Sequence, residues 1–306
     1  NENYYKGEPS IKNVVFQIIE NADTAILALQ NGEVDAYQMT PQQVKKLDLD
    51  ASNLSTYSYS EGRVGYLEIN CNRVTDEKVR KALLYAMDRK AMDDAAFESS
   101  EYYSIPYTFL PTNSQFYTED GVEKYEQDVD KAKSMLEDAG VSGLKLKLGY
   151  MSSDAVQSAQ ALLIQEQLKE VGVTVELAGG DGTAIANAMK DPDNEYDMYL
   201  GGYIMGIDPD TFSSLFENDG AYNYMHYSGY DTIDQLFEEG RSELDESARK
   251  ETYAKLQAAV QDTGAFYPII SNNKILVVNN RIQGVEDAGL VPVYTFEDTS
   301  SLKIAE

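Results

Sequence analysis

The chain has 306 residues and a mass of 34.1 kDa, room for two domains of average size, and 42% of its residues are hydrophobic, enough to fill a core. It carries 25 Lys and Arg against 52 Asp and Glu, a net charge of −27, which repels phosphate backbones and argues against nucleic-acid binding. No apolar stretch approaches the ~20 residues of a membrane span. The lone cysteine, Cys71, excludes an internal disulfide, and the lone histidine, His226, disfavours chemistry that needs several imidazoles.

The first elements form a unit too small to stand alone. Residues 13–19 (NVVFQII) predict a strand, and a helix with apolar Ile26 and Leu29 follows and ends at Gly32. The next segment alternates as a strand over 66–69.

A helix is then predicted over 76–90, capped by Thr75, with Arg89 and Lys90 at its carboxyl end to oppose the helix dipole. Its apolar residues recur at helical spacing on one face: Val79, Ala82, Leu83, Ala86 and Met87.

The clearest topological signal lies between residues 144 and 177. A strand over 144–148 and a strand over 173–177 flank a helix over 154–171, a sequence typical of a right-handed parallel crossover. Further helices are predicted over 125–140 and 183–189, and another strand over 196–200. This middle region therefore predicts an α/β sheet covered on both faces.

The last third predicts helices over 231–240 and 246–262, followed by the strands FYPII (266–270) and KILVV (274–278) with no helix between them. These short strands resemble the elements predicted at the start of the chain more than those of the middle region. We therefore expect residues 66–265 to form an inserted α/β lobe, and residues 1–65 and 266–306 to form parts of one other lobe, with the chain crossing between them twice.

Motifs for catalysis and cofactors are weak. The glycines of 179–184 (GGDGTA) lack the lysine of a phosphate loop, and the acidic run 191–197 lacks the glycine and glutamate of a calcium loop. No G-x-S-x-G elbow occurs, and chance carboxylate pairs carry no weight among 52 acids. We expect no catalytic residue, no metal site and no cofactor.

A tyrosine-rich loop remains, and tyrosine offers an apolar face and a hydroxyl that suit a cleft for a polar organic solute. The alternative is a surface loop whose tyrosines pack the sheet edge. The loop follows a predicted strand end, where α/β sheets place ligands. Its candidate residues are Tyr203, Met205, Asp208, Tyr224, His226 and Tyr227.

Six segments in this order resemble one family, the extracellular solute-binding proteins of family 5, which are the oligopeptide- and dipeptide-binding components of ABC importers. The resemblance implies a periplasmic-binding-protein-like (type II, Venus-flytrap) fold whose two lobes close on a solute. It also implies that this chain is the C-terminal portion, with lobe one incomplete. The segments are 14–37, 66–92, 125–140, 159–177, 196–209 and 248–269.

The resemblance also implies site residues. Glu68 matches a position that can face bound peptide, and Tyr66 lies on the same strand face. Tyr203 matches the usual Trp of the strand-end motif, and His226 with Tyr227 matches a His-Tyr pair of oligopeptide binders. The alternative to a ligand contact is that Glu68 is a strand-end carboxylate exposed to water.

One departure from the family concerns the peptide's amino group. Peptide binders usually place an Asp a few residues before the Asp-Pro pair, whereas residues 203–207 read Tyr-Ile-Met-Gly-Ile without an acid. Asp208 either takes the place of this missing Asp or shapes the turn. A buried ammonium without a carboxylate is costly, so free-amine peptide recognition is in doubt.

We therefore expect a non-enzymatic protein that binds a peptide or similar small polar solute and docks on an ABC transporter permease. Alternatives are an oligosaccharide or a metal chelate on the same fold and, less favoured, a hydrolase. The resemblance implies a monomer outside the cytoplasm, in the periplasm or lipid-anchored to the outer face of the cytoplasmic membrane.

Overall fold

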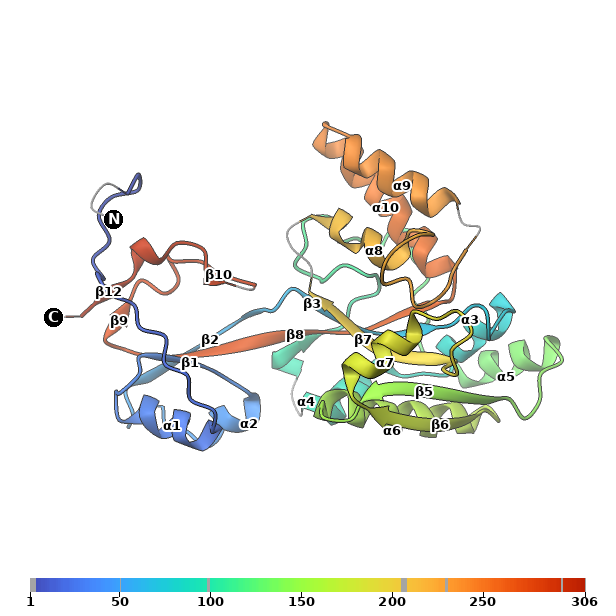
Figure 1. Cartoon of the computed structure of the whole chain (residues 1–306), viewed down its shortest axis with the longest axis horizontal. Helices are drawn as coiled ribbons and strands as arrows, with labels where there is room; N and C mark the ends of the chain where they lie inside the picture. The colour runs from blue at the N-terminus through green and yellow to red at the C-terminus, as the bar shows by residue number, and fades with distance from the viewer. Residues whose placement is uncertain are drawn as a thin grey trace. The chain divides into compact units, whose positions relative to one another are not determined.

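The computed structural model describes residues 4–49, 51–97, 100–204, 208–228, 231–292 and 294–305 (Figure 1). The chain divides into two compact units, one of Asn1–Glu61 with Asn272–Glu306 and one of Gly62–Ser271. The assignment of these units to a partial lobe and an inserted lobe stays a prediction. Among the described helices, none has the length and apolarity needed to cross a membrane.

The second unit is built on a mixed sheet around β3 (Arg63–Ile69). β7 (Met198–Ile204) lies antiparallel on one side of β3, and the first part of β8 (Phe266–Asn279) lies antiparallel on the other. Beyond β7 follow β5 (Lys145–Met151) and β6 (Thr174–Gly180), so that the order is β8-β3-β7-β5-β6.

The predicted crossover is confirmed. β5 and β6 are parallel neighbours with Leu148 opposite Leu177, and α6 (Ala155–Glu170) joins them. The Asp154 carboxylate accepts hydrogen bonds from the first turn of α6, and the chain leaves the helix at Gly172 with φ 81°. Local caps therefore define both ends of this helix.

The prediction of one helix over 76–90 is wrong, because two helices form: α3 (Glu77–Tyr85) and α4 (Arg89–Phe97). The N-cap of α3 is Asp76 and not Thr75. Arg89 starts α4 instead of ending α3. Its guanidinium is buried and donates to two backbone carbonyls from distant segments, so tertiary contacts place it and not the helix dipole.

The other predicted helices of this unit form, and two short ones at the tyrosine-rich loop were not predicted. Gly264, with φ 62°, ends the last helix as expected. The helices are α5 (Val129–Asp138), α7 (Gly182–Met189), α9 (Asp231–Ser242) and α10 (Glu246–Asp262), with the unpredicted η2 (Pro209–Phe212) and α8 (Ser213–Phe216); η1 (Ser100–Tyr102) and β4 (Tyr103–Ser104) complete the unit.

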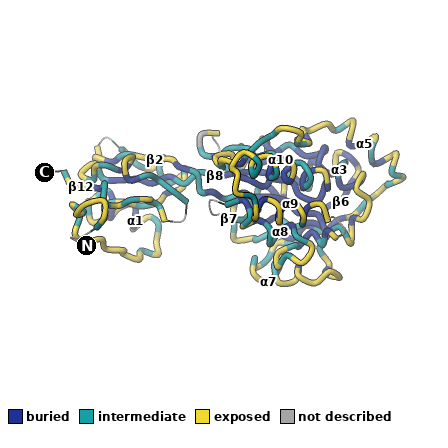
Figure 2. The backbone as a smooth tube through the Cα atoms, turned by 90° about the horizontal axis from the view of Figure 1, so that it is seen from above, coloured by how far each residue is buried: buried dark blue, intermediate teal, exposed yellow. Residues whose placement is uncertain are grey.

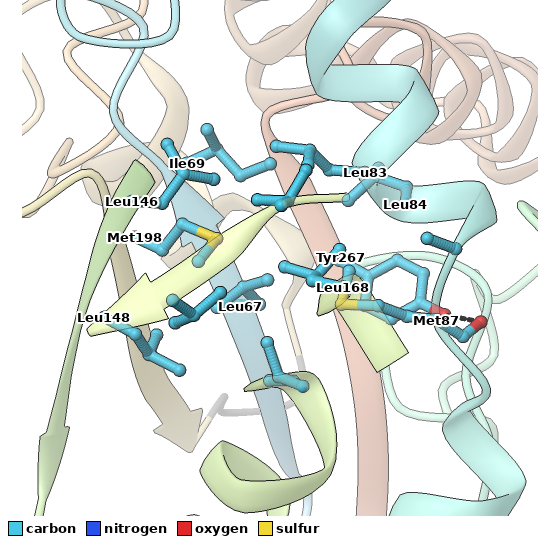
Figure 3. Close-up of a cluster of buried hydrophobic side chains, with 14 of the residues drawn as sticks. Leu67, Ile69, Leu83, Leu84, Met87, Leu146, Leu148, Leu168, Met198 and Tyr267 are labelled. Carbon is cyan, nitrogen blue, oxygen red and sulfur yellow. Dashed lines mark hydrogen bonds between the residues drawn. The ribbon is translucent and has the colours of Figure 1, made fainter. Parts of the chain in front are cut away.

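Both faces of the second unit's sheet are covered by apolar side chains. Figure 2 shows buried residues in the interior of this unit. Leu67 and Ile69 of β3 belong to a cluster with residues of α3, α5 and α6 (Figure 3). Val64 and Tyr66 belong to a cluster with residues of α8, α9 and α10. The alternation along β3 therefore separates two cores.

The first unit surrounds the second part of β8, which pairs antiparallel with β1 and with β2. β8 is one strand of 14 residues where two separate strands were predicted. The unit consists of α1 (Ala22–Gln30), β1 (Ala36–Met39), α2 (Pro41–Val44), β2 (Leu54–Ser60), β9 (Ile282–Gln283), β10 (Leu290–Val291), β11 (Thr295–Phe296), η3 (Thr299–Ser301) and β12 (Lys303–Ile304).

The strand predicted over 13–19 does not form. Residues 11–21 have no regular structure, and the side chains of Phe16 and Ile18 are each 92% exposed. A strand needs a neighbour to accept and donate its backbone hydrogen bonds, and within the described ranges no strand pairs with this segment. Its apolar composition alone is therefore insufficient.

Candidate functional site

The strands β5, β6 and β7 run in the same direction, so their carboxyl ends lie at one edge of the second unit's sheet, beside the amino end of β3. We call this the carboxyl edge and define it by Arg63, Tyr150, Met151, Gly180 and Tyr203. Open α/β sheets bind ligands at such edges. Two of its five residues are tyrosines, which offer ring faces and hydroxyl groups to a solute.

Tyr203 is the predicted site residue that lies at the carboxyl edge. Its ring packs 5.3 Å from the Phe212 ring, and its hydroxyl lies 3.3 Å from the Ser214 hydroxyl. Tyr222, 43% exposed, lies next to it at 6.4 Å between ring centroids. Met205 was also predicted for the site but lies outside the described residues.

The carboxyl group of Glu68 is buried in the second unit. It is fully buried, and neither carboxyl oxygen has a hydrogen-bond partner in the described part of the chain. Burial raises the pKa of this carboxyl well above its usual range, so the protein favours the neutral acid. The alternative of a strand-end carboxylate in water is therefore wrong.

Tyrosines surround Glu68. Tyr199 lies opposite Glu68 in the β3–β7 register, and the Tyr224 ring lies 5.9 Å from the Tyr199 ring. Burial raises the pKa of Tyr199 to about 12, and the nearby Glu68 adds to the shift. Tyr66 and Tyr224, both predicted, and Tyr199, not predicted, thus form one cluster. The antiparallel register that selects Tyr199 could not be derived from local sequence.

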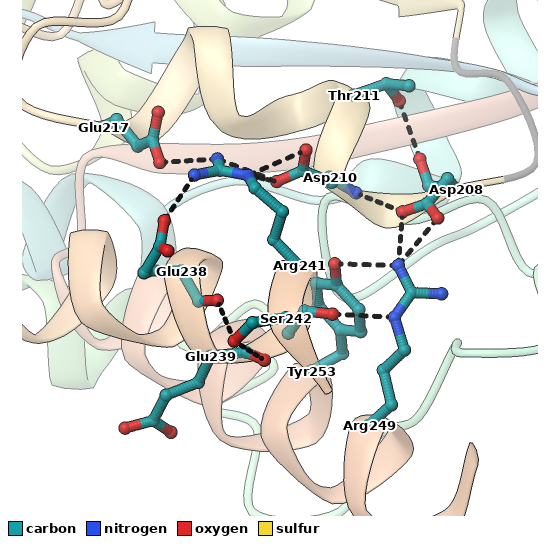
Figure 4. Close-up of polar contacts among 11 residues, drawn as sticks. Asp208, Asp210, Thr211, Glu217, Glu238, Glu239, Arg241, Ser242, Arg249 and Tyr253 are labelled. Carbon is teal, nitrogen blue, oxygen red and sulfur yellow. Dashed lines mark hydrogen bonds and ion pairs between the residues drawn. The ribbon is translucent and has the colours of Figure 1, made fainter. Parts of the chain in front are cut away.

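Asp208 is held by contacts within the protein. Its carboxylate accepts a hydrogen bond from the Asp210 backbone and lies 2.6 Å from Nη2 of Arg249 on α10 (Figure 4). Next to it, Arg241 pairs with Asp210 and Glu217, each at 2.9 Å. Because the Asp208 carboxylate is already paired, the geometry favours the turn-shaping alternative over a contact with a solute ammonium.

His226 and Tyr227 lie elsewhere, at a cavity of about 390 Å³ near the carboxyl end of β3. Nε2 of His226 lies 2.8 Å from the Met189 carbonyl oxygen, and Tyr227 is buried. Tyr224 joins this cavity to the cluster around Glu68. The cavity lining is mostly polar: Asn72, Lys190, Asn218, Asp219, Gly220, Ala221, Asn223, Tyr224, His226, Tyr227 and Ser228.

The predicted site residues within the described ranges fall into groups, and Tyr222 links two of these groups because its ring lies 6.4 Å from the Tyr203 ring and 6.2 Å from the Tyr224 ring. Tyr66, Glu68 and Tyr224 lie together, Tyr203 lies at the carboxyl edge, and Asp208 lies in an ion-pair network. Among the described residues, no group of three or more His, Cys, Asp or Glu side chains could hold a metal ion. Sequence reasoning missed Arg63 at the carboxyl edge.

Comparison with known proteins gives a consistent result. Residues 1–224 match the family model described as bacterial extracellular solute-binding proteins, family 5 Middle. Over 92% of its own length, the chain is 25% identical to the oligopeptide-binding protein AppA of Bacillus subtilis. Over 99% of its own length, it is 23% identical to the nickel-binding periplasmic protein of Escherichia coli. It superposes over its whole length on the ABC transporter substrate binding protein CtaP of Listeria monocytogenes, with a TM-score of 0.93 and 37% identity.

The chain is shorter than these proteins. It spans 54% of AppA, 61% of the nickel-binding protein and 63% of the CtaP chain. The fold is that of the type II periplasmic-binding proteins, and the partial coverage fits a fold in which one lobe is incomplete.

Proposed function

Because the chain belongs to the bacterial extracellular solute-binding proteins of family 5, we propose that it binds a peptide or a similar small polar solute as part of an ABC importer. The family consists of solute-binding proteins and not of enzymes. The observation that carries the proposal is the similarity over the whole chain to CtaP, itself described as an ABC transporter substrate binding protein. The name of AppA supports a peptide as the solute.

The geometry of the second unit supports this function. The carboxyl edge carries the rings of Tyr203 and Tyr150, which pack against the clusters on opposite faces of the sheet. A Cβ atom on Gly179 would come within 2.7 Å of the Tyr150 side chain. Rigid aromatic faces next to strand ends suit an extended polar solute, which binds through ring contacts and backbone hydrogen bonds.

Peptide binding is tested by native mass spectrometry of the purified protein with a defined tetrapeptide library, followed by calorimetry of the peptides retained. We expect Tyr203→Ala to weaken binding about tenfold, because it removes a ring contact. Tyr294→Ala, which changes a tyrosine that is 82% exposed in the first unit, is the matched control and should bind as the wild type does. Failure to retain any peptide would refute the peptide assignment.

A metal chelate or an oligosaccharide is the second candidate. The similarity to the nickel-binding protein and the cavity lined by His226 and amide side chains favour it. The same experiment with nickel–histidine complexes and with maltooligosaccharides distinguishes the two candidates.

We also propose that the protein acts outside the cytoplasm, in the periplasm or lipid-anchored to the outer face of the cytoplasmic membrane, and delivers its solute as a monomer to the permease. Crosslinking to the permease in intact cells tests this partner.

A further inference from the structure

The polar cavity near the carboxyl end of β3 lies at the opposite edge of the sheet from the carboxyl edge. Asn72, which lines the cavity, follows shortly after Ile69, the last residue of β3, whereas the carboxyl edge lies beside the first residue, Arg63. The 7 residues of β3 span about 20 Å at ~3.3 Å for each step. The cavity and the carboxyl edge are therefore two separate places on the second unit.

Hydrogen bonds within the second unit hold the walls of this cavity. The backbone amide of Cys71 donates to the Met225 carbonyl oxygen at 2.7 Å, which joins the end of β3 to the loop that lines the cavity. Within that loop, the side-chain amide of Asn223 donates to the carbonyl oxygens of Glu217 and Tyr227 at 3.2 and 3.1 Å. The cavity is therefore preformed, and a solute that enters it does not have to order its walls.

The backbone and ring of His226 give one wall a defined hydrogen-bond acceptor. The φ of His226 is 47°, in the left-handed region that residues other than glycine adopt less readily. Its Nε2 lies 2.8 Å from the Met189 carbonyl oxygen. A carbonyl oxygen only accepts hydrogen bonds, so Nε2 carries the proton and Nδ1 of the neutral ring is an acceptor. An acceptor of this kind suits a solute that carries hydroxyl groups.

The charge and polarity of the lining also match a neutral solute with many hydroxyl groups. The lining contains one cation, Lys190, and one anion, Asp219, so its formal charges cancel within a chain of net charge −27. Its amide and hydroxyl groups both donate and accept hydrogen bonds, as sugar hydroxyls do. The ring of Tyr224 offers an apolar surface to the CH groups of a sugar ring.

The size of the cavity agrees with this class of solute. Its volume of about 390 Å³ corresponds to about 13 water molecules at ~30 Å³ each. One or two sugar rings therefore fit, whereas a long oligosaccharide does not.

We propose that this cavity is a second ligand-binding site, separate from the carboxyl edge, for a neutral mono- or disaccharide. A sugar hydroxyl donates to Nδ1 of His226, the Asn72 amide hydrogen-bonds to a neighbouring hydroxyl, and the sugar ring packs against Tyr224. The inference goes beyond the proposed function, because a peptide bound at the carboxyl edge leaves this cavity open.

The test is saturation-transfer NMR followed by calorimetric titration of the protein with glucose, N-acetylglucosamine, maltose and lactose. We expect at least one of these sugars to bind with a Kd in the millimolar range or tighter. Ala221→Trp places a large side chain in the cavity lining and should abolish this binding. His226→Phe keeps a flat ring without its nitrogens and should weaken binding about 3- to 10-fold, the loss expected for one hydrogen bond.

Two controls complete the test, and circular dichroism confirms that each variant is folded. Ala95→Trp changes an exposed alanine of α4 outside the cavity lining and should bind sugar as the wild type does. Tyr203→Ala, at the carboxyl edge, should also leave sugar binding unchanged.

The inference is overturned if none of the four sugars binds, if sugar binding survives both Ala221→Trp and His226→Phe, or if Tyr203→Ala abolishes it. A protein that binds a sugar in this cavity but retains no peptide supports the inference and refutes the proposed peptide function alone.

Discussion

Asp93 of α4 offers a direct test of the buried electrostatics. The residue is fully buried, its Oδ1 lies 3.5 Å from Nε2 of Gln160, and its Oδ2 has no hydrogen-bond partner among the described residues. Burial raises the pKa of Asp93 from 3.8 to about 8, although Gln160 and Arg89 lower it in part. Asp93→Asn replaces the carboxyl with a neutral group of the same shape.

The sign and size of the effect follow from proton linkage. A raised pKa means that the folded protein holds the proton more tightly, so the stability from this group is fully present below pH 3.8 and is lost as the pH rises toward 8. Between pH 3.8 and pH 7 the free energy of unfolding falls over about three pH units, at about 1.4 kcal/mol for each unit, so that about 4 kcal/mol is lost at pH 7. Asp93→Asn does not titrate and avoids this loss.

The assay is urea unfolding of the wild type and Asp93→Asn from pH 4 to pH 8, followed by far-ultraviolet circular dichroism. We expect the free energy of unfolding of the variant, relative to the wild type, to rise by about 4 kcal/mol between pH 4 and pH 7. Asp94→Asn is the matched control: hydrogen bonds from Lys90 and Tyr103 lower the pKa of Asp94 below 3.8, so its contribution changes below the range of the assay and the difference from the wild type should stay nearly constant from about pH 5 to pH 8. A difference for Asp93→Asn that does not change with pH would refute the reasoning.

Three further predictions concern the same unit. Glu68→Gln should gain stability over the wild type as the pH rises above 4.5, because burial raises the pKa of Glu68, and a pH-independent difference in urea unfolding would contradict this. Asp208→Asn should cost about 1 kcal/mol, since its pair with Arg249 is partly exposed and its cap is weakened, while calorimetry should show unchanged solute affinity; weaker binding would argue for a ligand role. Leu67→Ala should cost about 2–5 kcal/mol in urea unfolding, because the side chain is fully buried, and a cost below about 1 kcal/mol would show that the core is misassigned.

Elements with local signals were predictable from the sequence. The crossover could be predicted from the two flanking strands, the Asp154 cap and the stop at Gly172, although the buried face of the helix over 155–170 also includes Gln157, Gln160 and Gln167. The last long helix likewise begins after its Asp245 cap and ends before Gly264. In these segments the side chains that cap and cover the helix are within a few residues of its backbone.

Pairings between distant segments were decided by the tertiary structure. Side chains alternate between the two faces of a strand, so the sequence places Tyr66 and Glu68 on one face of β3. Only the β3–β7 register brings Tyr199 opposite Glu68. The same pairing sets Gly202 under the guanidinium of Arg63, which no local pattern marks.

The role of a polar residue also depended on tertiary contacts. Asp208 could bind a solute or shape a turn, and its ion pair with Arg249 of α10 favours the turn. The segment 13–19 has the composition of a strand but no partner among the described strands, so it forms no strand and is mostly exposed. Propensity and capping act within one helical turn or one strand, whereas burial, register and ion pairing depend on segments that only folding brings together.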